Sequence, residues 1–148
     1  MLELSAEEAD IVAAEASAAA GVLEGPRRQQ ASDLARDAPG GEIPDSLLTT
    51  LERILLASLQ GGRARQLYKA EGERILTRVL LRTPGGQRLQ HDLDAVNQAL
   101  RALAGRRLDQ VRVAMRVPGH FTVSLQSEGV GLVLAVRPDG VAVESLTA

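Results

Sequence analysis

The hydrophobic pattern of this chain changes its period once, close to Leu108. Before that residue, apolar side chains recur at the spacing of a helix face; after it, they alternate with polar side chains as on a strand. A chain with this order forms its helices first and its strands afterwards. We therefore predict an α+β fold, in which about four N-terminal helices precede a four-stranded antiparallel β-meander and pack on one face of it.

Turn residues divide the alternating part into strands. Residues 128–129 and 139–140 favour two-residue hairpin turns, and 118–120 is interpreted as a three-residue turn that pairs Val117 with Phe121. The predicted strands are 109–117, 121–127, 130–137 and 141–146. The side predicted to face the core carries Val113, Met115, Phe121, Val123, Leu125, Leu132, Leu134 and Val143.

Capping residues and helical spacing define the N-terminal part. Ser5 and Glu8 match a capping box, and Asp45 is a typical N-cap ahead of a leucine-rich face. Thr83-Pro84 should end the third helix. The predicted helices are 6–23, 45–60, 63–82 and 88–104.

Composition predicts three segments. Residues 1–25 form a helix so rich in Ala that it offers little apolar area, and we expect it to dock on its own chain or on a second copy rather than to join the central core. Residues 26–44, rich in Gly, Pro, Gln and charge, are expected to form a flexible connector. Residues 45–148 then form the α+β core domain.

The residue types needed for most catalysis are scarce. Cys is absent and there are two His residues, so the chain cannot build a cage of nitrogen and sulfur ligands for a metal. His91 lies beside Asp92 and Asp94, but this group is interpreted as an exposed helix start, and His120 falls in a turn. We predict no catalytic residue, no metal site and no cofactor.

Charge is distributed unevenly along the chain. The first 62 residues carry a net charge of −7, residues 63–107 carry +6, and the remainder carries −1. The basic block could bind nucleic acid or another polyanion. However, Tyr68 is its only aromatic residue, and the acidic N-terminal part is a ready partner for it, so ion pairing between the two is the favoured interpretation.

Two groups of residues are candidates for binding. The densest polar group on one predicted helix, with a glycine in its middle, consists of Arg63, Arg65, Tyr68, Glu71 and Gly72. A weakly apolar strip on the outer side of the third strand, which could form an interface, consists of Gly131, Val133 and Ala135.

These features favour a non-catalytic protein-interaction or assembly module that self-associates. Polyanion or nucleic-acid binding through the basic helices 63–107 is the alternative, and a small-ligand-binding domain or an enzyme comes third. The expected partner is a protein, including a second copy of the chain, and not a membrane. The lack of Cys, of a signal peptide and of a long apolar run predicts a cytoplasmic protein, and the excess of Arg over Lys is typical of GC-rich bacterial genomes.

Overall fold

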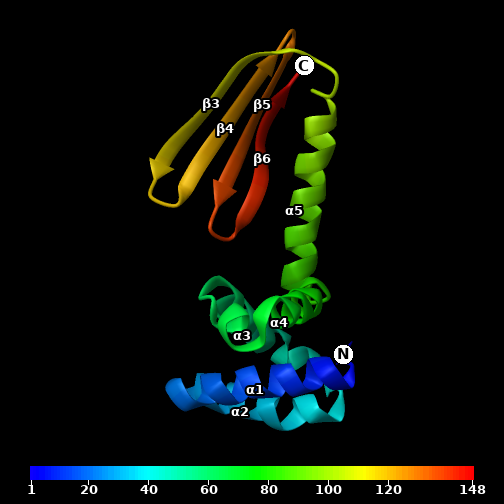
Figure 1. Ribbon diagram of the computed structural model, residues 1–148, viewed down its shortest axis with the longest axis vertical. Coiled ribbons are helices and arrows are strands. Elements are labelled where there is room, and N and C mark those ends of the chain that lie inside the picture. Colours follow the sequence, from blue (N-terminus) through cyan, green and yellow to red (C-terminus); the bar gives the residue numbers. More distant parts are fainter. The chain divides into compact units, whose positions relative to one another are not determined.

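The computed structural model describes all 148 residues and confirms the α+β class (Figure 1). Five α-helices come first, and a four-stranded antiparallel meander follows. Instead of one core over 45–148, the chain forms two compact units, Met1–Gln87 and Arg88–Ala148, which we call the helical unit and the sheet unit. None of the helices is long and apolar enough to cross a membrane.

The helical unit contains four helices and a two-stranded ladder. Leu2 pairs with Ile43 in that ladder, which ties the N-terminus to the segment ahead of the third helix. The capping box at Ser5 and Glu8 is present. In chain order, the elements are β1 (Leu2–Glu3), α1 (Ala6–Val22), α2 (Gly25–Asp37), the 3-10 helix η1 (Ala38–Gly40), β2 (Glu42–Ile43), the 3-10 helix η2 (Asp45–Leu47), α3 (Leu48–Gln60) and α4 (Arg63–Leu81).

The segment expected to be a flexible connector, 26–44, is ordered and mostly helical. Pro26 lies in the first turn of α2, where a missing backbone N–H costs nothing, so the Gly-Pro pair starts a helix here instead of breaking one. The helix is held by a narrow apolar stripe, because Ala31 and Leu34 are completely buried, as is Ala38 directly after the helix. Three small or medium apolar residues are a weak signal within a polar sequence.

Helix α1 also differs from the expectation. Val12 and Ala16 are buried in the main core of the helical unit, together with Leu34, Leu51 and Leu76 from the other helices. The small Ala side chains therefore serve close packing inside this unit, and α1 is a core element of its own chain. Deleting residues 1–25 should consequently unfold the helical unit rather than release a dispensable docking helix.

Helix α5 (Pro84–Arg101) begins four residues before the predicted start at 88. Thr83 is completely buried; its hydroxyl donates to the Leu80 carbonyl at 2.7 Å and accepts from the Gly86 amide at 3.1 Å. The Glu52 carboxylate accepts from the Gly85 amide at 2.6 Å. These bonds satisfy N-terminal amides of α5, so a sequence expected to stop one helix also starts the next.

The sheet unit is an antiparallel meander in which each strand pairs with the next. The strands are β3 (Leu108–Val117), β4 (His120–Ser127), β5 (Val130–Arg137) and β6 (Gly140–Thr147). The predicted pairing of Leu125 with Leu132 is confirmed, but Phe121 pairs with Met115 instead of Val117. The first turn is one residue shorter than expected, and a bulge between Met115 and Val117 shifts the register by one residue more. The pairing of β3 with β4 is therefore displaced by two residues, which leaves the same side chains on the apolar side; Val113, for example, pairs with Val123.

One helix covers the apolar side of this sheet only in part. Val96 and Ala99 of α5, and Leu103 in the turn after it, pack against β5, where Leu132 and Leu134 are buried. Figure 1 shows α5 alongside the β6 side of the sheet, with β3 farthest from it. The predicted inward side is therefore buried at its centre and open along β3.

Candidate functional site

A buried carboxylate on α1 organises the polar cluster of the helical unit. Only 2% of the Glu15 side chain is exposed, and both of its oxygens accept hydrogen bonds from Nε of Arg63, at 3.0 and 3.2 Å. The Tyr68 hydroxyl donates to the same carboxylate at 2.7 Å. A buried acid with a cationic and a hydroxyl partner avoids the cost of an unpaired charge.

Helix α4 is kinked where it presents these two partners. Lys69 has φ +60° and ψ −161°, and it is the only residue other than glycine with a positive φ. The kink folds the Tyr68 side chain against Gly72, so that a Cβ at position 72 would overlap the Cβ of Tyr68. Gly72 is thus required by a neighbouring side chain of its own helix.

The environment of Tyr68 changes its acidity. Burial, the hydrogen bond to Glu15 and the negative charge of Glu15 together raise the pKa of Tyr68 to about 12, against an opposing effect of Arg63. The phenol therefore stays protonated and donates to Glu15 across the ordinary pH range.

We expect the phenolate absorbance of the folded protein to appear with a midpoint near pH 12, as measured by ultraviolet titration. Tyr68 is the only tyrosine, so the signal is unambiguous. Because the folded pKa exceeds the unfolded value of about 10, the contribution of Tyr68 to stability is complete below pH 10 and is lost as pH rises towards 12. Glu15→Gln should move the midpoint downwards. A wild-type midpoint near 10, with circular dichroism showing a folded chain, would contradict the buried bond.

A second acid of α1 makes a parallel contact with α4. The Glu8 carboxylate accepts from Arg82 at 2.6 Å and from the Ser5 amide at 3.0 Å. Burial raises the pKa of Glu8, but the bonds from Ser5 and Arg82 and the nearby positive charges outweigh it, so the pKa lies below its usual range. The acidic α1 is thus ion-paired with Arg63 at the start of α4 and with Arg82, the C-cap residue of α4, within one chain.

The other predicted polar residues do not join the cluster. Arg65 pairs with Glu73 at 3.2 Å, and Glu71 pairs with Arg74 at the same distance, all along α4. Exposed pairs of this kind contribute little to stability. Of the five candidates, Arg63 and Tyr68 meet at Glu15, Gly72 supports Tyr68, and Arg65 and Glu71 face solvent.

A groove of about 650 Å³ lies beside the Glu15 cluster, between α1, α2 and α3. We call it the helical groove. Its apolar lining consists of Ala18, Ala19, Val22, Leu23, Ile54 and Ala57. Its polar lining consists of Glu15, Arg27, Gln30, Thr50, Arg53, Ser58 and Arg63. A volume in this range suits a small molecule.

Two features of the polar lining are unusual. Arg27 and Arg53 form no ion pair, so the lining carries more positive than negative charge even after Arg63 is paired with Glu15. Ser58 is 3% exposed, and its hydroxyl is the one buried side-chain polar atom that makes no hydrogen bond. The Ser58 hydroxyl therefore loses its contacts with water without gaining a partner inside the helical unit.

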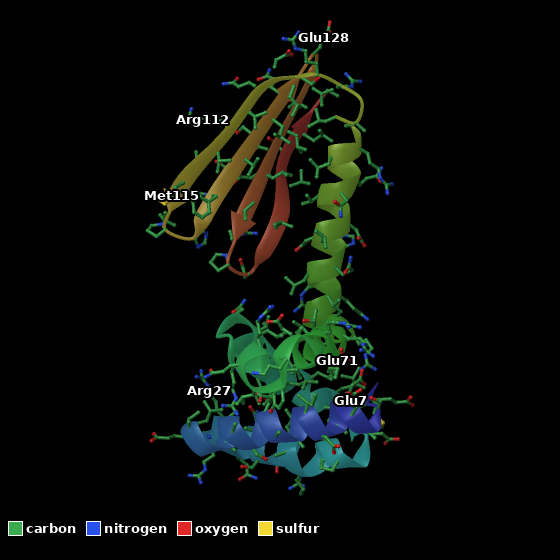
Figure 2. All side chains as sticks on the ribbon, viewed as in Figure 1. Glu7, Arg27, Glu71, Arg112, Met115 and Glu128 are labelled. Carbon is green, nitrogen blue, oxygen red and sulfur yellow. The ribbon has the colours of Figure 1, made fainter.

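The sheet unit has a different kind of open surface. Val111, Val113, Met115 and Phe121 lie on the apolar side of β3 and β4, with exposed fractions of 58, 63, 63 and 37%. We call these four residues the uncovered sheet face. Figure 2 shows Met115 and Arg112 on β3, one of the two edge strands of the sheet.

The strip predicted on the outer side of β5 is only partly accessible. Gly131, Val133 and Ala135 are all half-buried. The Thr147 hydroxyl donates to the Gly131 carbonyl at 3.4 Å and occupies the space beside that glycine. Neighbouring strands therefore shield much of this strip, and the larger open apolar area lies on β3.

The histidine group has the surroundings expected of a solvated helix surface. His91, Asp92 and Asp94 are exposed on α5, and Asp94 accepts from the Gln90 amide at 3.0 Å. No group of three or more His, Asp or Glu side chains could hold a metal ion.

Sequence reasoning missed Glu15, Arg27, Arg53 and Ser58. A signal existed for Glu15, since it lies three and seven residues after Val12 and Glu8, on the face of α1 that is buried. Comparison with protein-family models, curated proteins and solved structures finds no match to the chain.

Proposed function

We propose that this protein is a non-catalytic interaction module that self-associates through the uncovered sheet face. The observation that carries the proposal is the exposure of four large apolar side chains on one side of β3 and β4. Single exposed apolar residues are ordinary, but a contiguous group of them on a regular strand is typical of an interaction site.

The chemistry of this face favours a second copy of the chain as its partner. The four residues carry no charge or hydrogen-bonding group, so the face complements itself under a two-fold axis. The polar side of the same strand differs, because it carries Arg112 and Arg116, and Arg116 lies 3.8 Å from the Glu144 carboxylate. A charged partner would find no complement on the apolar side, whereas two copies exclude water from each other.

The position of β3 adds to this argument. It is an edge strand of ten residues, and edge strands in monomeric proteins are ordinarily protected by charge, by proline or by a covering element. Arg112 and Arg116 provide charge on the polar side of β3, but its apolar side carries no charge from Val111 to Met115. Packing of two such faces would cover the sheet where α5 does not.

Sedimentation analysis over a range of concentrations tests the proposal. The wild-type chain should form dimers as concentration rises, and Val113→Lys should shift the equilibrium to monomer by at least about tenfold, because it places a charge in the interface. Gln110→Lys is the matched control, since it adds the same charge on the polar side of β3 and should leave the mass unchanged. A wild-type chain that stays monomeric at all concentrations would refute self-association.

Polyanion binding by residues 63–107 is the weaker alternative. Four of the basic side chains of that block, Arg63, Arg65, Arg74 and Arg82, are engaged by Glu15, Glu73, Glu71 and Glu8. Each pair lowers the positive charge offered to an external phosphate. A steep dependence of nucleic-acid affinity on salt would support this alternative against the one proposed here.

A further inference from the structure

We infer that the helical groove binds a small amphipathic anion with an aliphatic chain, of the class of medium-chain carboxylates. This inference concerns the helical unit alone and does not depend on self-association of the sheet unit. It rests on the shape and lining of the groove, on its unpaired cations and on the buried Ser58 hydroxyl.

The apolar walls of the groove indicate which kind of apolar group the ligand carries. They are formed by Ala, Val, Leu and Ile side chains from α1 and α3 and from the turn after α1. No aromatic residue lines the groove, so an aromatic ligand would find no ring to stack on. Small aliphatic side chains instead form a smooth surface that suits a flexible hydrocarbon chain.

The charged side chains of the groove indicate that the polar end of the ligand is an anion. Glu15 is already neutralised by Arg63, whereas Arg27 and Arg53 have no acidic partner. Guanidinium groups bind carboxylates with two parallel hydrogen bonds, which makes them specific for planar anions. A cationic ligand would be repelled, and a neutral one would leave both arginines without a partner.

Ser58 provides an independent indication of a ligand. A buried hydroxyl without a hydrogen bond destabilises a fold, because it has lost its contacts with water and gained nothing in return. Ser58 lies in the lining of the groove, so its hydroxyl could donate a hydrogen bond to a carboxylate oxygen there. Alanine at this position would suit the structure better if no ligand were bound.

Isothermal titration calorimetry with decanoate, below the concentration at which it forms micelles, tests the inference. Decanoate should bind with one site per chain, whereas acetate, which lacks the chain, and decanol, which lacks the charge, should each bind at least about tenfold more weakly. Failure of decanoate to bind, or equal binding of decanol, would overturn the inference.

Variants locate the binding site. Ala57→Trp should abolish binding, because Ala57 is exposed on the groove wall and a large ring there fills the space without disturbing the core. Arg27→Gln with Arg53→Gln should weaken decanoate at least tenfold and leave decanol unchanged. Arg101→Gln, an exposed arginine on α5, is the control. Full binding by Ala57→Trp would place the ligand elsewhere and refute the site.

Ser58→Ala separates a ligand-binding role from a structural one. It should raise the melting temperature, since it removes a buried hydroxyl that has no partner, and it should weaken decanoate binding. If Ser58 did not contact the ligand, Ser58→Ala would change the melting temperature but not the affinity for decanoate. That result, combined with unchanged decanoate affinity, would remove Ser58 from the site and contradict the inferred geometry.

Discussion

Replacing Leu132 with alanine should reduce the free energy of unfolding of the sheet unit by about 2 to 5 kcal/mol, whereas Met115→Ala should reduce it by less than about 1 kcal/mol. Both residues lie on the apolar side of the same sheet. Leu132 is 1% exposed beneath α5, and Met115 is 63% exposed on β3. Truncation creates a cavity only at the first site.

Urea denaturation at low protein concentration, followed through the amide signals of β4 and β5, measures both effects. Dilution keeps the chain monomeric, so that any contribution of Met115 to association does not enter. Val113→Ala serves as a second exposed control, because Val113 is as open as Met115. Similar losses at Leu132 and Met115 would show that β3 is covered within the monomer.

The different burial of Leu132 and Met115 could not be predicted from the alternation of apolar and polar residues. The four strands begin and end within one residue of their predicted bounds, because alternating apolar residues and turn dipeptides are local signals. Alternation also assigns Met115 and Leu132 to one side of the sheet. It does not tell how much of that side is covered, which depends on the width of one helix, α5, relative to four strands.

This limit also changes an energetic expectation. Because the sequence places Phe121 and Leu134 on the side predicted to face the core, truncation of either to alanine is expected from the sequence to reduce the free energy of unfolding by about 2 to 5 kcal/mol. Leu134 is 8% exposed and keeps that expectation, but Phe121 is 37% exposed at the uncovered sheet face. The expected cost at Phe121 is therefore smaller, and its large apolar side chain contributes more to the proposed interface than to the core.

The candidate site was predictable in part. Arg63 and Tyr68 belong to the polar group predicted on one helix, but their common partner Glu15 lies 48 and 53 residues earlier in the chain. No local pattern records such a contact. The helical groove was not predictable from the sequence either, because α2, which supplies Arg27, belongs to a segment whose composition is typical of a connector.

Gly72→Ala should destabilise the helical unit by about 1 to 3 kcal/mol or more, although alanine ordinarily favours a helix over glycine by about 1 kcal/mol. The added Cβ would overlap the Cβ of Tyr68, which the kink at Lys69 folds against this glycine. Tyr68 cannot move aside without losing its hydrogen bond to Glu15. The unfavourable contact should therefore outweigh helix propensity and reverse the usual sign of the substitution.

Two readouts distinguish this explanation from a general loss of packing. In Gly72→Ala, the pKa of Tyr68 should fall from about 12 towards its ordinary value of about 10, since the displaced phenol is hydrated and leaves Glu15. Lys69→Gly is the matched variant, because glycine accepts the positive φ that strains lysine, and it should stabilise the helical unit by about 1 kcal/mol while the Tyr68 titration stays high. If Gly72→Ala raised stability and Lys69→Gly lowered it, α4 would be a straight helix in solution, and the cluster around Glu15 would have to be assembled differently.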